Sequence, residues 1–532
     1  MPATRLLLLS GLTVLAACPV QVYAAFDNTR FDNVAVYWGQ NSYGATHSDT
    51  ANFQKTLSTY CQDNAIDVIP IAFITTFFST GGLPSLNLAN TCNPVDNATF
   101  PGTNLANCAS LASDIQFCQS KGKLVTLSLG GAGGGVGFTG DSQGQAFADT
   151  IWNLFLGGSS STRPFGSAVL DGVDLDIEGG SGTGYAAFVN QIRSHAAGAS
   201  KKYYITAAPQ CVFPDASLGT VLNTASFDAV YVQFYNNPCG LQNFNSASNW
   251  DFGLWDAWAR TTSPNPNVKI YIGAPASSTA AGGGYQAIGT LSSIAVQMRE
   301  SFPSFGGVML WDASQAFANG RYDLAIKNAL AGAGGTGFTF PACAAPAFAA
   351  GSNYPGGSQV SFGGYVWQAK WFASAQPANN PNSDWSAISA CTGSGASPTS
   401  SSSAPGSSPS AGSCAGVPAW TSTAVFTGGQ QATFSGHLWT AKWWTQGDTP
   451  GGSAGVWTDD GACASTKGGI SAAAAAATVG HAPVASTVEG KVSPSATAVA
   501  HPPATQTGTG SSSTAKADEQ HTNVKRSRIF RA

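Results

Sequence analysis

Three acidic side chains alternate with three apolar ones in a short segment near residue 175. Asp174, Asp176 and Glu178 are separated by single Leu and Ile residues, and a Val precedes the first acid. Successive side chains of a β-strand point to opposite faces, so all three acids would lie on one face. Carboxylates this close repel each other, and at least one is expected to keep its proton near neutral pH. A protonated carboxylic acid is the general acid that cleavage of a glycosidic bond requires.

The pattern alone leaves two further roles open for this acidic segment. The acids could form the solvent face of a strand whose apolar face covers the core. They could also bind a metal ion, but the segment contains no His, a common partner of carboxylates in metal sites. We expect neither a metal ion nor a cofactor.

The acidic segment belongs to a series of short apolar runs separated by longer stretches compatible with helices. Eight runs are predicted as strands, at residues 34–38, 68–74, 124–129, 172–178, 203–208, 229–235, 269–274 and 306–311. Eight strands separated by crossovers within roughly 300 residues are typical of a (β/α)8 TIM barrel. We therefore predict an α/β barrel domain over residues 25–335. A barrel strand has no solvent face, so the apolar residues would pack under the helices and the acids would point to the barrel axis.

The order of the acids places Glu178 at one end of the barrel. It is the last acid of its predicted strand and precedes a Gly-Gly-Ser-Gly segment. This position is the C-terminal mouth, where barrel enzymes have their active sites. Asp171 has the opposite strand parity, and we expect it to brace the strand entrance.

The motif Asp171-x-x-Asp174-x-Asp176-x-Glu178 resembles the signature of glycoside hydrolase family 18. Further motifs resemble the plant and fungal class III chitinases of that family: Tyr37-Trp-Gly-Gln-Asn41, Ser128-Leu-Gly-Gly131, Thr206-Ala-Ala-Pro-Gln-Cys211, Phe213-Pro-Asp215, Gln233-Phe-Tyr-Asn-Asn-Pro238 and Trp311-Asp-Ala-Ser314. They lie on six of the eight predicted strands or just after them, and cover nearly all of residues 30–315. The resemblance implies chitin, a β-1,4-linked polymer of N-acetylglucosamine, as the substrate of an endo-acting enzyme.

The resemblance also implies a retaining mechanism in which the substrate assists its own cleavage. Glu178 would protonate the glycosidic oxygen, and the 2-acetamido carbonyl of the sugar would attack the anomeric carbon to give an oxazolinium ion. Asp176 would orient the acetamido group, and Asp174 would share a proton behind it. Tyr235 would donate a hydrogen bond to the acetamido oxygen. Trp311 would form an apolar floor under the distorted sugar.

Five further residues are expected to contact the sugar chain: Gln233, Asn236, Tyr37, Gly130 and Gly131. The two glycines would act by letting the backbone approach the substrate.

Composition divides the chain outside the barrel. Residues 1–24 combine a basic residue, an apolar core and a small-residue cleavage site, the pattern of a secretory signal peptide. An alternative is a bacterial lipoprotein signal, because Leu15-Ala-Ala-Cys18 resembles a lipobox. Residues 392–413 are rich in Ser, Pro and Gly and are predicted to be a linker. Residues 464–532 turn to Ala, Ser, Thr and Pro and are predicted to be a disordered tail.

An internal repeat precedes the tail. An offset of 72 residues maps Trp367 onto Trp439 and Trp385 onto Trp457, and the surrounding Ala-Lys-Trp segments also align. The two copies, at 343–391 and 414–463, are predicted to be small β-rich modules. A module this small has a limited core, so each copy is expected to close with one disulfide: Cys343–Cys391 in the first and Cys414–Cys463 in the second.

The repeats resemble the chitin- and cellulose-binding modules of families 5 and 12, marked by a Gly-x-x-Tyr/Trp-x-Ala-Lys-Trp-Trp core. The second copy, Gly436-His-Leu-Trp-Thr-Ala-Lys-Trp-Trp444, follows this pattern more closely than the first. Rings expected to stack on the polymer are Trp371, Phe372, Trp385, Trp420, Trp443, Trp444 and Trp457. The alternative is that many of these rings form the module cores, as we expect for Trp367 and Trp439.

Charge and cysteine content favour a secreted, extracellular protein with a neutral partner. Such a protein could also associate with a cell wall. Charged residues are 9% of the chain and the net charge is −4, which argues against nucleic acid. No apolar run is long enough for a membrane span. Apart from Cys18, ten cysteines remain for disulfides: Cys61, Cys92, Cys108 and Cys118, then Cys211 and Cys239, and the two module pairs. Asn97-Ala-Thr99 is a glycosylation sequon, and we expect a monomer.

Two other functions remain open from the sequence. One is a lysozyme-like hydrolase of other N-acetylglucosamine polymers, such as peptidoglycan. The other is a non-catalytic chitin-binding lectin. Barrel relatives that became lectins usually lose the acid that this chain retains as Glu178.

Overall fold

The computed structural model describes residues 26–133, 135–392, 414, 416–426, 430–441, 445–452 and 456–463. The chain divides near residue 400 into two compact units, each of which is described by itself. The first contains a barrel and one small sheet module, and the second contains another small sheet module. The predicted signal peptide and tail, and the linker beyond its first residue, lie outside the described residues.

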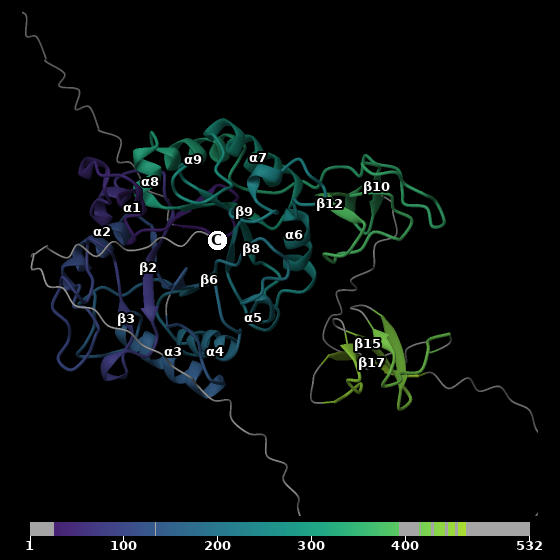
Figure 1. The fold of residues 1–532 in the computed structure, drawn as a ribbon, viewed down its shortest axis with the longest axis horizontal. Helices are drawn as coiled ribbons and strands as arrows, with labels where there is room; N and C mark the ends of the chain where they lie inside the picture. Colours follow the sequence, from purple (N-terminus) through teal and green to yellow (C-terminus); the bar gives the residue numbers. More distant parts are fainter. Residues whose placement is uncertain are drawn as a thin grey trace, which may run out of the picture. The chain divides into compact units, whose positions relative to one another are not determined.

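Eight parallel strands close into a barrel in the first unit (Figure 1). They are β1 (Asn33–Val36), β2 (Val68–Thr76), β4 (Leu124–Gly131), β5 (Gly172–Ile177), β6 (Tyr204–Ala207), β7 (Ala229–Gln233), β8 (Lys269–Pro275) and β9 (Phe305–Trp311). Strand β1 pairs with both β9 and β2, which closes the ring. The (β/α)8 class and all eight predicted strands are confirmed. A short strand that was not predicted, β3 (Ser85–Leu86), pairs antiparallel with β2.

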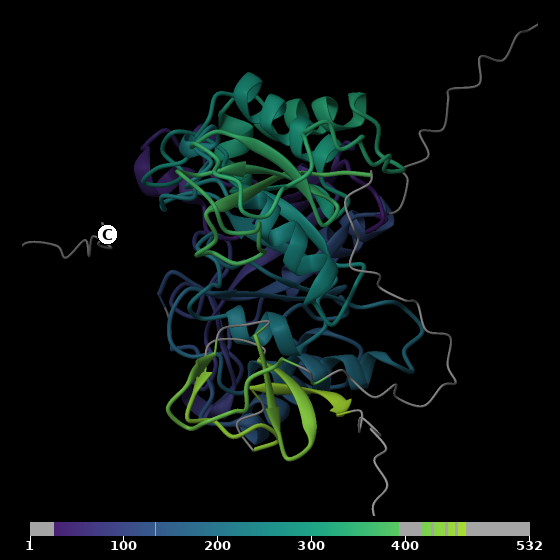
Figure 2. The same ribbon diagram turned by 90° about the vertical axis from the view of Figure 1, so that its right-hand side faces the viewer.

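Helices surround the ring of strands, as Figures 1 and 2 show. They are α1 (Ser42–Thr46), α2 (Ala112–Ser120), α3 (Asp141–Phe155), α4 (Tyr185–Ala196), α5 (Gly219–Thr224), α6 (Phe252–Thr261), α7 (Ile288–Ser301), α8 (Ala313–Ala318) and α9 (Tyr322–Gly332). Short 3-10 turns lie at η1 (Thr50–Asn52), η2 (Leu57–Cys61), η3 (Thr80–Gly82), η4 (Ala109–Leu111) and η5 (Leu241–Asn243).

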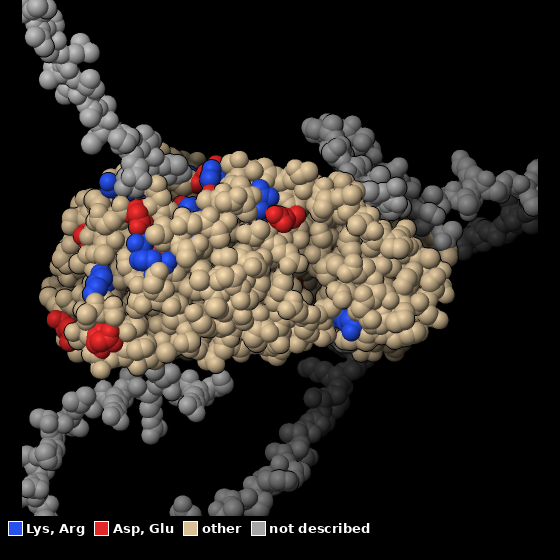
Figure 3. Space-filling view, turned by 90° about the horizontal axis from the view of Figure 1, so that it is seen from above, with Lys and Arg blue, Asp and Glu red and all other residues tan. Residues whose placement is uncertain are grey.

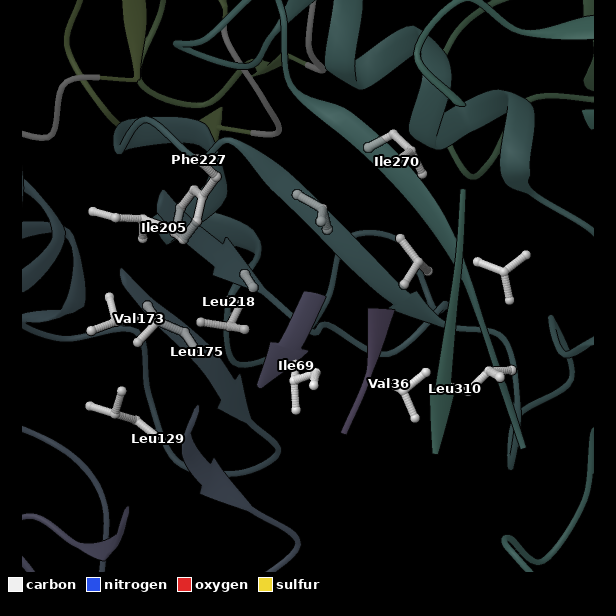
Figure 4. Packing of buried hydrophobic residues seen from close by; sticks show 14 of the residues in the cluster. Val36, Ile69, Leu129, Val173, Leu175, Ile205, Leu218, Phe227, Ile270 and Leu310 are labelled. Atoms are coloured by element: carbon white, nitrogen blue, oxygen red, sulfur yellow. The ribbon is translucent and has the colours of Figure 1, made fainter. Parts of the chain in front are cut away.

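The main apolar core contains the strand residues whose parity is opposite to that of the acids. Val173 and Leu175 of β5 are completely buried and belong to one cluster with Leu129 of β4 and Ile205 of β6 (Figure 4). Strand residues of the other parity, among them Tyr231, form a separate cluster. The predicted alternation is therefore confirmed: apolar residues of β5 enter the main core, and the acids point to the other side.

Five disulfides link the cysteines of the described residues: Cys61–Cys118, Cys92–Cys108, Cys211–Cys239, Cys343–Cys391 and Cys414–Cys463. The last two confirm the predicted closure of the modules. Cys211 and Cys239 lie in the loops that follow β6 and β7, so their bond ties together two loops at the C-terminal end of the barrel.

The first module is a three-stranded antiparallel sheet, β10 (Gln359–Phe362), β11 (Tyr365–Ala369) and β12 (Trp385–Ala390). The second module repeats it with β14 (Gln431–Phe434), β15 (His437–Ala441) and β17 (Trp457–Ala462). A separate pair, β13 (Val425–Phe426) and β16 (Thr445–Gln446), completes the second module. Trp367 and Trp439 occupy the same register position in the two sheets, which supports the internal repeat.

The first module packs directly on helix α6 of the barrel. The hydroxyl of Tyr365 donates to Asp256 Oδ2 at 2.7 Å and accepts a hydrogen bond from Arg260 Nη1 at 2.7 Å. Asp256 is completely buried, so this network is shielded from water. A Cβ added to Gly253 would lie 2.1 Å from the carbonyl oxygen of Ala387, which shows how closely α6 approaches β12. The sequence did not predict this contact.

Charged side chains are sparse on the surface shown in Figure 3, where Lys, Arg, Asp and Glu stand as isolated groups among uncharged residues. No helix in the described ranges is long and apolar enough to cross a membrane.

Candidate active site

The three acids of β5 form a row that runs from the barrel interior to its mouth. Asp174 is completely buried, Asp176 is 4% exposed, and Glu178 is exposed immediately after the strand ends. Parallel pairing sets Asp174 opposite Ser128 of β4 and Thr206 of β6. The register of the barrel therefore decides which polar groups meet each acid.

Asp174 is held by hydroxyl groups from three other segments of the barrel. Its Oδ2 accepts from the Tyr37 hydroxyl and from Ser128 Oγ, both at 2.7 Å, and its Oδ1 accepts from Thr206 Oγ1 at 2.6 Å. Burial raises the pKa of Asp174, while the three hydroxyl donors oppose that rise. The arrangement makes Asp174 a fixed, enclosed carboxyl group behind Asp176.

Asp176 and Glu178 form a coupled pair of acids. Burial raises the pKa of Asp176 well above its usual value, and the charges of Glu178 and Asp174 raise it further. The Glu178 side chain opens on the mouth, but neighbouring atoms enclose its carboxyl group enough for burial to raise its pKa as well. Because both values shift upward, the pair retains a proton at a pH where isolated carboxyl groups are ionised.

Aromatic rings line the mouth beside the acids. Tyr235 is 7% exposed and lies close enough to Asp176 and Glu178 for their charges to raise the pKa of its hydroxyl, after the larger effect of burial. Trp311, at the end of β9, is half-buried. Its ring stacks on Phe73 with the ring centres 5.8 Å apart. Phe73 was not predicted to belong to this site, because its partner Trp311 is remote in the chain.

Several residues predicted as sugar contacts hold other parts of the protein. The Tyr37 hydroxyl binds Asp174, as described above. Gln233 is 3% exposed and donates through Nε2 to Asp176 Oδ1 and to the carbonyl oxygen of Ala208, both at 2.9 Å. Both side chains therefore position the acids in this structure. That they also contact the sugar stays a prediction.

The glycines after Ser128 serve the packing of the barrel. A Cβ at Gly130 would lie 2.1 Å from the carbonyl oxygen of Asp176, and one at Gly131 would lie 2.9 Å from the Phe73 ring. Both have positive φ values, which favour glycine. The two glycines therefore allow strand β5 and the Phe73 ring to approach β4 closely. The approach of substrate to them stays a prediction. Asn236 is exposed, and its Oδ1 accepts from the Gly283 amide at 3.0 Å.

Two aspartates outside the row have clear structural effects. Asp215 is 7% exposed, and its charge raises the pKa of both Asp176 and Glu178. Its place in the Phe213-Pro-Asp215 motif was the signal that could have identified it. Asp171 accepts from the Val125 amide at 2.8 Å and from Lys201 Nζ at 2.9 Å. The expectation that Asp171 braces the strand entrance is consistent with these bonds.

The module rings divide into exposed and buried groups. Trp371 and Phe372 of the first module are 50% and 62% exposed. Trp385 and Trp457 are 2% and 6% exposed and lie in the cores of their modules, so the prediction that they stack on a polymer is corrected. A buried ring offers no face to a sugar chain. Trp420 is half-buried. Trp443 and Trp444 lie outside the described residues.

Comparisons with known proteins match two parts of the chain. The model of glycosyl hydrolases family 18 matches residues 33–292, and that of carbohydrate-binding module family 5/12 matches residues 419–458. Endochitinase 33 of Trichoderma harzianum is 40% identical over 60% of this chain and 99% of its own length. Chitinase 2 of Rhizopus oligosporus is 51% identical over 57% of this chain and 53% of its own length, so the chain spans about half of that relative.

Among solved structures, the crystal structure of the chitinase ICChI from Ipomoea carnea is similar to this chain. It is 34% identical, with a TM-score of 0.46 over 56% of this chain and 99% of the other.

Proposed function

The chain belongs to glycosyl hydrolases family 18, and from this we infer that it is an endochitinase cleaving β-1,4 bonds between N-acetylglucosamine units. The observation that carries the proposal is the row of acids on β5. One carboxyl group, Glu178, reaches the mouth, and a second, Asp176, stands buried behind it with a raised pKa. Such a pair retains one proton between its two carboxyl groups, which gives a proton donor and a negative charge at neighbouring points.

In the proposed mechanism, Glu178 donates its proton to the glycosidic oxygen as the bond to the anomeric carbon breaks. The acetamido carbonyl oxygen of the same sugar attacks that carbon and forms an oxazolinium ion. Water, deprotonated by Glu178, then opens this ion with net retention. Asp176 is poorly placed to act as nucleophile, because it is buried and Gln233 holds its Oδ1.

The remaining site residues orient the acetamido group and the sugar. Asp176 accepts a hydrogen bond from the acetamido N–H and stabilises the positive charge that develops on the ring. Asp174, behind it, shares a proton with Asp176. The Tyr235 hydroxyl donates to the acetamido oxygen and aligns it for attack. Trp311 supplies the apolar surface beneath the sugar. This chemistry restricts the substrate to sugars that carry an acetamido group.

Activity is expected to fall as pH rises through the raised pKa of Glu178, because only the protonated acid can donate. Above that pKa, kcat/KM should drop about tenfold per pH unit. The charge of Asp215 raises the pKa of Glu178, so Asp215→Asn should move this alkaline limb to lower pH. The measurement is a pH profile on a soluble N-acetylglucosamine oligomer, with Asp141→Asn on the exposed start of α3 as the control. An unmoved limb in Asp215→Asn would contradict this assignment.

The substrate is tested by comparing chitin oligomers with bacterial cell wall. We expect faster hydrolysis of the chitin oligomers by the wild-type protein. A strong preference for the wall would favour the lysozyme-like alternative. Absence of turnover on both would favour the lectin.

We propose that both modules bind chitin and that together they hold the enzyme on the insoluble polymer through a high effective concentration. In the first module, Trp371 and Phe372 are the exposed rings available for stacking. Trp371→Ala should weaken binding to insoluble chitin severalfold, since one stacking contact is lost, and should leave hydrolysis of short soluble oligomers unchanged. A pull-down on insoluble chitin measures the binding. The comparison variant is Trp385→Ala, which removes a ring from the module core and should therefore lower Tm.

We further propose a secreted protein. The disulfides of both units suit an oxidising compartment, and Asn97 of the glycosylation sequon is exposed in the loop closed by Cys92–Cys108. The signal peptide predicted at residues 1–24 supports the same location.

A further inference from the structure

A cavity of about 280 Å³ lies between the barrel and the first module, outside the row of acids. The barrel supplies residues from the loops after β6 and β7, including Phe213 and Asn249, and the module supplies the segment 378–381. The same two loops carry Gln210, which donates to Gln233 Oε1 at 3.2 Å, and Tyr235 of the catalytic mouth. The Cys211–Cys239 bond joins the two loops. The cavity and the active site therefore share one framework.

The cavity wall combines aromatic rings with uncharged polar groups. Phe213 and Trp250 contribute rings from the barrel, and Asn249, Asn379 and Asn380 contribute amides at its edge. A sugar ring has an apolar C–H face and a rim of hydroxyl groups, so rings and amides are the partners it requires. The volume of about 280 Å³ lies just below the usual range of ligand sites, about 300–1,000 Å³, so the cavity is large enough for no more than a single sugar unit.

Two polar atoms in residues of this wall have no hydrogen-bond partner. They are Nε1 of Trp250 and Oδ1 of Asp251, and both are buried. An unpaired buried donor or acceptor costs about 1–3 kcal/mol. Burial also raises the pKa of Asp251 well above its usual value, although Lys370 of the module opposes the rise. Neither atom is reachable from the cavity, so ring faces and amide groups are the parts of the wall that a ligand can contact.

We propose that this cavity is a second saccharide site, which binds one N-acetylglucosamine unit of the polymer through Trp250 and Asn379. The inference rests on the proposed function, because that function supplies the ligand. Since barrel and module both form the walls, the contact of Tyr365 with Asp256 and Arg260 also keeps the site intact.

The site can be located by hydrogen exchange on the full-length Glu178→Gln protein with and without an N-acetylglucosamine hexamer. We expect protection of peptides covering 246–251 and 376–382, in addition to those around β5 and Tyr235. Protection around β5 without protection of the other two segments would overturn the second site alone. No protection anywhere would instead count against the proposed function.

Asn379→Ala separates a binding role from a structural one. Asn379 is exposed on the cavity wall, so its truncation should change Tm little. The variant should lose the protection of 376–382 and show KM on polymeric chitin raised about threefold to tenfold, with kcat on a short oligomer unchanged.

Asn380→Ala should reproduce the rise in KM. Asn382→Ala, in the same loop but outside the cavity wall, should not. An equal rise in Asn382→Ala, or unchanged KM in both Asn379→Ala and Asn380→Ala, would refute the assignment.

Discussion

Replacing Glu178 with Gln is expected to lower kcat on soluble N-acetylglucosamine oligomers by about 10²- to 10⁴-fold, the usual contribution of a general acid. Gln has nearly the same shape and cannot donate a proton to the leaving oxygen. The side chain is exposed at the mouth after β5, so the substitution should leave the barrel core intact. Steady-state hydrolysis of an oligomer with a chromogenic leaving group measures the loss.

The matched control for this variant is Glu300→Gln, an exposed Glu on α7. It should retain wild-type turnover. Binding of Glu178→Gln to chitin should persist, because the module rings and the aromatic mouth are unchanged. Turnover in Glu178→Gln within a few-fold of wild type would rule out Glu178 as the acid.

Asp176→Asn is expected to lower kcat by about 10²- to 10³-fold, the range seen when one preorganised electrostatic contact is removed from an active site. Asn can still accept the hydrogen bond from Gln233, so the side chain should stay in place. It no longer carries the negative charge that stabilises the oxazolinium ion. Oligomer kinetics should therefore show a large fall in kcat with a small change in KM.

The same variant should be more stable than the wild type at neutral pH. The folded-state pKa of Asp176 is raised, so the folded protein holds this proton more tightly than the unfolded chain does. The free energy of unfolding therefore falls as pH rises from the pKa of the unfolded-state carboxyl group to the raised pKa of the folded state. Asn removes this loss, and its Tm advantage should grow with pH in calorimetry. A lower Tm than wild type at every pH would contradict this account.

Asp174→Asn is the informative contrast. Asp174 accepts from three hydroxyl groups, and an amide offers one acceptor oxygen in place of two. The variant should lose activity without the gain in Tm, because the lost acceptor offsets the removal of a buried charge.

Features that depend on local periodicity were predictable from the sequence. The eight apolar runs identified the strands, and the alternation in 172–178 correctly separated the acids from the core residues. Parity is a property of one strand, so a single sequence is enough to establish it. The position of Glu178 after its strand followed from the same argument.

Features that depend on which distant residues meet were not predictable. The register of β7 brings Gln233 to Asp176, and the loop after β1 brings Tyr37 to Asp174; neither contact was predicted. Trp385 and Trp457 carry the aromatic signature of a binding module, yet their sheets fold over them. Aromatic type alone does not distinguish a core ring from a binding ring, because burial depends on packing between strands.

The docking of the first module on α6 makes the two repeats non-interchangeable. The offset of 72 residues maps Tyr365 onto His437 and Ala387 onto Asp459. In the second copy, the His437 ring and the Asp459 carboxyl group form an exposed, hydrogen-bonded polar pair. Placed against Gly253 and Asp256, that pair would be enclosed beside an already buried carboxylate, and its desolvation would oppose docking. The first copy therefore carries a surface that fits α6, and the second copy carries a polar surface at the corresponding positions. Exchanging their order would leave α6 uncovered.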